Sequence, residues 1–198
     1  MKRVFFLLLL ALSVSAAFAG SPIKLISGSV NGMNKQTVTI FMEFDYSDCK
    51  IFDEDTEVTF EPDDFYAMKG DDWVRDKGKD IPEAEKSFSE TFNEESDNIV
   101  AVYKRELATY TIVYKMDLFC YGNPVATMIA GPFTPKNARG FALGTFDVID
   151  NSTNEVVAKL SSDRIYGAIY AATWSIKREY VYDNVAEELA EFFNNQKK

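Results

Sequence analysis

The stretch from Leu107 to Tyr121 constrains the fold most strongly, because it is the longest strict alternation of apolar and polar residues in the sequence. An extended chain turns successive side chains to opposite faces, so this stretch predicts a strand with one buried and one solvated face. The buried face is expected to contain Ala108, Tyr110, Ile112, Tyr114, Met116, Leu118 and Cys120. The solvated face is expected to contain Thr109, Thr111, Lys115 and Asp117.

Four other stretches predict strands. Residues Thr37 to Tyr46 repeat the one-sided alternation, and Ile23 to Val30 forms a shorter strand before it. Residues Arg139 to Asp150 and Glu155 to Asp163 are separated by a compact polar turn, which predicts an antiparallel hairpin.

The region from about 47 to 82 is rich in Asp, Glu, Gly and Lys, which predicts an acidic insertion of short helices. Pro62 suits the first position of one helix, and Gly70 suits its end. A second short helix is expected to stop at Gly78, and a longer helix is expected to begin again at Pro82.

Two amphipathic segments predict the main covering helices. The helix after Pro82 has a narrow apolar stripe that includes Ala84, Phe88 and Phe92. The last segment, roughly Trp174 to Asn195, has a broader stripe formed by Trp174, Val181, Val185, Leu189, Phe192 and Phe193.

The order of these elements predicts an α/β (α+β) fold. Because the strands alternate and are not continuously apolar, one sheet face should be covered and the other exposed. We expect a two-layer sandwich with about five strands in a mixed sheet and two main helices on one face.

The first 19 residues have the three parts of a secretory signal peptide. A basic start at Lys2 and Arg3 precedes an apolar run, and Ala17 and Ala19 form a small-residue cleavage site. We expect cleavage near Ala19, a single domain over residues 20–198, and a periplasmic or extracellular location. No later stretch approaches the ~20 apolar residues that a transmembrane helix needs.

The charge balance argues against nucleic acid as a partner. The predicted leader contains two of the 21 basic residues and none of the 31 acidic residues, so the remainder has a net charge of −12. A phosphate backbone requires a surface of the opposite sign. The acidity is concentrated between Glu43 and Asp97. A solvated surface and a site for a cationic partner are the two explanations for it.

The chain contains no histidine. A Ser-His-Asp or Cys-His nucleophile and His-ligated metals are therefore excluded, and no motif indicates a catalytic residue or a cofactor. A pair of carboxylates could still serve a glycosidase, which places them ~5 to 10 Å apart across the scissile bond.

Two groups of side chains are weak candidates for ligand or metal binding. Calcium could bind Asp53, Asp55, Asp63 and Asp64, but the spacing departs from an EF-hand loop, and a solvated loop is the favoured explanation. The aromatic candidates are Trp73, Tyr166 and Tyr170. Trp73 lies among charged residues and could contact a ligand or anchor a loop. Tyr166 and Tyr170 could form a stacking platform or pack in the core.

Cys49 closely follows the second predicted strand, and Cys120 lies at the end of the strand that ends at Tyr121. If these two strands are parallel neighbours, both cysteines lie at one edge of the sheet. A Cys49 to Cys120 disulfide is then possible and would stabilise an exported protein by about 4 kcal/mol in the chain-entropy model. Two buried free thiols are the alternative.

Several short motifs recur in the same order as in known families. They are Ile26 to Val30, Phe44-Asp45-Tyr46-Ser47, Trp73, Phe88, Phe92-Asn93, and Arg178 with Tyr182 in the last helix. In this order the chain resembles exported, functionally uncharacterised proteins of Bacteroidetes-type bacteria. The layout is also similar to small α/β domains of outer-membrane assembly lipoproteins and of periplasmic translocation proteins. The resemblance implies no catalytic residues, and the chain lacks the lipid-carrying cysteine of those lipoproteins.

These observations favour a non-enzymatic protein of the cell envelope, a binding or assembly module for a peptide, protein or glycan. Exposed sheet edges or the acidic insertion could recognise the partner. The alternative is a carboxylate-dependent hydrolase that acts on glycans. The sequence leaves the oligomeric state open.

Overall fold

The computed structural model describes residues 21–33, 37–168 and 173–196, so the predicted signal peptide lies outside the described residues. The strands are β1 (Ile23–Gly28), β2 (Val38–Asp45), β3 (Lys50–Asp53), β4 (Val58–Phe60), β5 (Ile99–Ala101), β6 (Tyr110–Gly122), β7 (Arg139–Asp150) and β8 (Glu155–Tyr166). The helices are α2 (Pro62–Lys69), α3 (Asp71–Glu95), α4 (Pro124–Ala130) and α5 (Trp174–Asn195), with short 3₁₀ turns η1 (Arg105–Leu107), η2 (Gly131–Phe133) and η3 (Lys136–Ala138).

The strands form one mixed sheet of eight strands in the order β1-β8-β7-β6-β2-β5, with β3 paired to β6 and β4 paired to β3. The mixed α/β class is confirmed, but the expected five-stranded sheet is too small. Strands β3, β4 and β5 were not predicted, because strands of three or four residues are too short to show a clear alternation. The hairpin of β7 and β8 is confirmed.

The parallel pairing predicted for the two alternating strands is confirmed, since Ile40 to Asp45 of β2 pair with Tyr110 to Lys115 of β6. Farther along the same edge of β6, β3 pairs with residues Leu118 to Cys120. Pairing along this edge of β6 therefore stops where β2 ends, at Asp45, and resumes where β3 begins, at Lys50. This interruption lies beside a bulge in β6, where the register with β7 shifts between Met116 and Leu118.

The bulge changes which side chains face the helices. One extra residue reverses the alternation in the strand beyond it. Phe119 and Tyr121 consequently contact Arg178 of α5. Leu118 and Cys120 therefore do not continue the row of Tyr114 and Met116 as predicted, although Cys120 is buried as expected.

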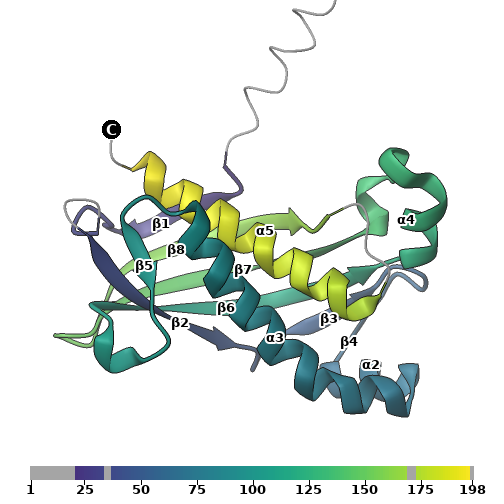
Figure 1. The fold of residues 1–198 in the computed structure, drawn as a ribbon. Coiled ribbons are helices and arrows are strands. Elements are labelled where there is room, and N and C mark those ends of the chain that lie inside the picture. Colours follow the sequence, from purple (N-terminus) through teal and green to yellow (C-terminus); the bar gives the residue numbers. More distant parts are fainter. Residues whose placement is uncertain (1–20, 34–36, 169–172, 197–198) are drawn as a thin grey trace, which may run out of the picture.

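Helices α3 and α5 cross the same face of the sheet side by side (Figure 1). Phe88 and Phe92 of α3 and Val185 and Leu189 of α5 are buried in a common core with the sheet. Helix α5 begins and ends where the sequence predicts. Among the described helices, none has the length and hydropathy needed to cross a membrane.

Helix α3 differs from its prediction because it runs without a break from Asp71 to Glu95, through Gly78 and Pro82. Two shorter helices were expected there. Proline lacks the N–H that would bond the carbonyl four residues earlier, which is that of Gly78. Docking of Ala84, Phe88 and Phe92 in the core compensates for this weak turn.

Candidate ligand-binding site

A cavity of about 360 Å³ lies between α2, α3, α5 and the interrupted edge of the sheet. It sits over the place where β2 ends, β3 begins and β6 bulges, so the three irregularities leave space under the helices. Its walls are predominantly apolar and include Ile51, Ile81, Pro82, Met116, Phe119 and Tyr182. Small-molecule sites have volumes of this order and similar apolar walls with a few polar groups.

Arg178 of α5 lines this cavity although its side chain is only 4% exposed. Its Nη2 atom donates hydrogen bonds to the hydroxyls of Tyr66 and Tyr121. The guanidinium also lies over the rings of Phe119 and Tyr121, at 5.2 and 5.1 Å from their centroids. Arginine stays charged in proteins, so Arg178 places a permanent positive charge in an aromatic surrounding.

No carboxylate compensates this charge within the described part of the chain, where Arg178 forms no ion pair and its Nε has no hydrogen-bond partner. An unpaired buried charge is costly, by several kcal/mol even after relaxation. The buried guanidinium is therefore the most unusual electrostatic feature of the cavity.

The two tyrosines that accept from Arg178 also contact each other, with 2.9 Å between the hydroxyl oxygens of Tyr66 and Tyr121. Burial raises the pKa of Tyr121 well above its usual value, which keeps this hydroxyl protonated. Only one of the two hydroxyl protons can point at the other tyrosine. One proton of the pair is thus left for another acceptor.

A second hydroxyl chain closes the other side of the cavity. Tyr46 donates to Glu85 at 2.7 Å, and its oxygen lies 2.9 Å from the hydroxyl of Tyr182. Because the Tyr46 proton is directed to Glu85, Tyr182 is the donor to Tyr46. Burial raises the pKa of Cys49, which also lines the cavity, to about 11, so its thiol stays neutral.

A separate buried cluster of ionisable groups involves Glu54, Cys120 and Lys177. Neither oxygen of Glu54 nor the Nζ of Lys177 has a hydrogen-bond partner among the described residues. Burial raises the pKa of Glu54 to about 7 and lowers that of Lys177 to about 8, while attraction between the two groups opposes both shifts. Burial also raises the pKa of Cys120 to about 12.

The predicted aromatic candidates do not come together. Trp73 packs against Trp174 and Tyr121, with ring centroids 4.8 and 5.1 Å apart, and lines a smaller cavity of about 200 Å³. Tyr166 lies elsewhere, beside Phe141 at 5.6 Å and under the ammonium of Lys136 at 5.7 Å. Tyr170 lies outside the described residues.

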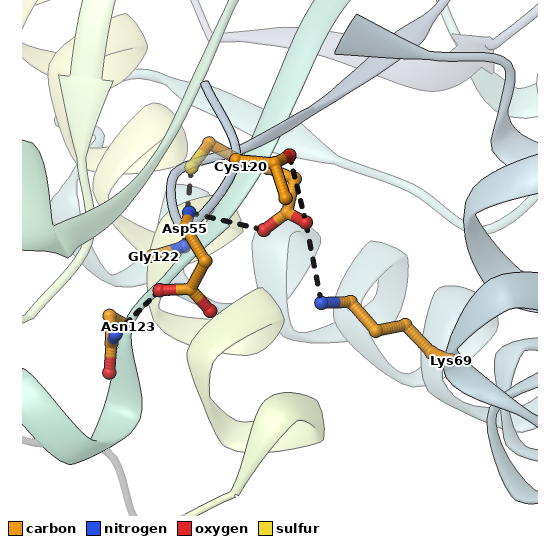
Figure 2. A network of polar contacts seen from close by, with 7 residues as sticks. Asp55, Lys69, Cys120, Gly122 and Asn123 are labelled. Carbon is orange, nitrogen blue, oxygen red and sulfur yellow. Dashed lines mark hydrogen bonds and ion pairs between the residues drawn. The ribbon is translucent and has the colours of Figure 1, made fainter. Parts of the chain in front are cut away.

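Three of the four calcium candidates, Asp53, Asp55 and Asp63, bond to other side chains. Figure 2 shows Asp55 accepting from Nδ2 of Asn123 at 2.8 Å, and Lys69 forms an ion pair with Asp53 at 3.6 Å. Asp63 pairs with Lys77 at 2.6 Å, and Asp64 is exposed at the start of α2. The described residues contain no group of three or more acidic or thiol side chains that could bind a metal ion.

Cys49 and Cys120 are both buried free thiols, and the predicted bridge is not formed. The register places Phe52, not Cys49, opposite Cys120. Three residues of strand separate Cys49 from that position by about 10 Å, whereas disulfides need Cα atoms within about 7 Å. The predicted strand pairing is correct even though the bridge is absent.

Arg178, Tyr66 and Tyr121 were not predicted as site residues. One signal was available for Arg178, because it lies four residues after Trp174 and four before Tyr182, on the apolar stripe of α5. A charged residue on an apolar helical face indicates a buried charge. The tyrosines come from α2 and β6 and meet Arg178 only in the folded chain.

No protein-family model matches the chain, and no curated protein matches it. Among solved structures it is similar to the PelC dodecamer from Paraburkholderia phytofirmans, with a TM-score of 0.41, 14% sequence identity, and coverage of 84% of this chain and 95% of that chain. A substituted variant of the same dodecamer gives a TM-score of 0.38 at 14% identity, over 84% of this chain and 96% of that chain. Likeness at this level carries no argument about fold or function.

Proposed function

We propose that the protein is an exported, non-enzymatic binding module of the cell envelope, and that its ligand occupies the cavity between α3 and α5. The observation that supports this most is the cavity itself, with apolar walls and one buried cation. Binding sites for small molecules combine these two features.

The lining of the cavity favours binding over the glycan hydrolase alternative. A glycosidase needs two carboxyl groups on either side of the bond that it breaks. The described residues that line this cavity include neither Asp nor Glu. Asp147, which is buried, is paired with Lys115 at 2.7 Å and with Lys159 at 3.3 Å, away from the cavity.

The lining of the cavity favours some of the partner classes expected from the sequence over others. A glycan would expose many hydroxyls to walls that offer few polar groups, and those hydroxyls would remain unpaired. An apolar group of a small molecule or of a peptide end fits the volume and the lining better.

Gly78 provides a direct test, because it lines the cavity and a Cβ atom added there meets no atom within 4 Å. We expect the neutral dye N-phenyl-1-naphthylamine to bind the wild type at one saturable site with increased fluorescence. Gly78→Phe should weaken this binding by at least about tenfold, since the ring fills space needed by the dye.

The matched control is Lys79→Phe, which adds the same ring at a side chain that is 77% exposed on the same helix. Circular dichroism and thermal melts would show that both variants are folded. Equal dye binding by Gly78→Phe and Lys79→Phe would contradict the proposed location of the site.

A further inference from the structure

The ligand class follows from the charge of Arg178, an inference that rests on the proposed function. We infer that the cavity binds an apolar monocarboxylate, whose carboxylate accepts hydrogen bonds from Arg178 and whose apolar body lies against the cavity walls. No Asp or Glu lines the cavity to supply the negative charge that a buried guanidinium needs.

The hydrogen-bond donors of the cavity are in excess of its acceptors. Arg178 uses Nη2 for its bonds to Tyr66 and Tyr121, and its Nε has no hydrogen-bond partner among the described residues. Tyr66 also lines the cavity, and its O–H is free to donate there when Tyr121 donates to Tyr66. A carboxylate offers two acceptor oxygens and no donor, which complements this arrangement.

The charge of the site favours one negative charge on the ligand. Lys77 also lines the cavity, but its ammonium is already paired with Asp63 at 2.6 Å. Arg178 is therefore the cation available to the ligand among the described lining residues. A phosphate monoester would bring close to two charges and three acceptor oxygens, more than one guanidinium can neutralise.

The apolar body of the ligand follows from the remaining walls. Ile51, Met116 and Phe119 line the cavity from the sheet, while Ile81 and Pro82 line it from α3. Such walls stabilise an aliphatic or aromatic group in proportion to the apolar area that leaves water.

Isothermal titration calorimetry with decanoate and decanamide tests the inference, because the two ligands differ in charge but hardly in shape. We expect decanoate to bind about tenfold to a hundredfold more tightly than decanamide, the usual effect of hydrogen bonds to a charged group. A short peptide ending in phenylalanine, with a free or an amidated carboxyl end, distinguishes a peptide terminus from a free aliphatic acid. Tight binding of either free acid over its amide supports the inference.

Arg178→Gln should abolish the difference between acid and amide, while Arg75→Gln on the exposed surface of α3 should preserve it. If Arg178→Gln does not fold, the comparison of ligands on the wild type still decides. Equal binding of each acid and its amide would overturn the inference and leave the proposed function standing. Absence of both acid binding and dye binding would overturn the two proposals together.

Discussion

At the scale of single residues, the consecutive pair Lys177 and Arg178 shows how two buried cations differ. Each side chain is 4% exposed. Arginine cannot release its proton, so Arg178 needs an anion or a set of acceptors, whereas lysine can become neutral. Burial lowers the pKa of Lys177 to about 8 and raises the pKa of the nearby Glu54 to about 7. Arg178 therefore keeps its charge in the interior, whereas Lys177 and Glu54 can change their protonation there.

Glu54 makes the stability of the protein depend on pH. Burial raises its folded pKa from 4.5 to about 7, so the folded state binds the proton more tightly than the unfolded state. This contribution is fully present below the unfolded pKa and is lost as the pH rises toward 7. Because Glu54 is only partly buried, solvent screening limits this contribution to about 1 kcal/mol.

As the pH rises from 5 to 8, the free energy of unfolding should therefore fall less in Glu54→Gln than in the wild type, because an amide does not titrate. Urea denaturation at a series of pH values measures this slope. Glu57→Gln, at an exposed position in the same turn, serves as the control and should follow the wild type. A wild-type slope in Glu54→Gln would show that Glu54 is not the group responsible.

At the scale of elements, α3 illustrates why local signals misled the prediction of helix ends. Gly78 and Pro82 are both unfavourable inside a helix, and they lie one turn apart. Tertiary packing of the apolar stripe outweighs both. The same pair lines the cavity, so the weakest turn of α3 borders the candidate site.

Gly78→Ala should stabilise the protein by about 0.5 to 1 kcal/mol, because glycine loses more backbone freedom on folding than alanine does. A Cβ atom at this position meets nothing within 4 Å. Thermal and urea denaturation would show the gain.

Gly144→Ala gives the opposite expectation and serves as the contrast. Gly144 pairs with Met116 beside the bulge, and a Cβ atom there would lie 2.1 Å from the carbonyl oxygen of Lys115. The variant should be clearly destabilised. A loss of stability in Gly78→Ala similar to that of Gly144→Ala would show that the helix is strained at Gly78.

Strand β6 shows how far an alternating pattern can predict structure. The pattern identified the strand and its parallel partner β2 correctly. It could not indicate the bulge at Asp117, because an extra residue in one strand depends on how its neighbour pairs. That single residue turns Phe119 and Tyr121 toward Arg178.

At the scale of the whole molecule, the long elements were predictable and the candidate site was not. Helix α5 and the hairpin of β7 and β8 have strong periodicity and clear turn residues, and their predictions agree with the structure. The hairpin of β3 and β4 lacks both signals. The cavity forms where this hairpin, the bulge and α3 meet, so no local sequence pattern could predict it.

The site residues are also spread along the chain. Tyr66 and Arg178 are 112 positions apart, and Tyr121 lies 57 positions before Arg178. Their common environment is a product of tertiary packing. The two cysteines illustrate the converse, because the pairing of β2 with β6 was predicted correctly, yet Cys49 precedes the unpredicted strand β3, whose register places Phe52 opposite Cys120.

The central claim is that Arg178 provides the anion-binding group of an apolar ligand site. A crystal structure of the protein with bound decanoate tests this most directly. The expected result is a carboxylate within hydrogen-bond distance of the Arg178 guanidinium, with the chain lying against Met116 and Phe119. Decanoate bound elsewhere, or a cavity filled by water alone at saturating decanoate, would contradict the claim.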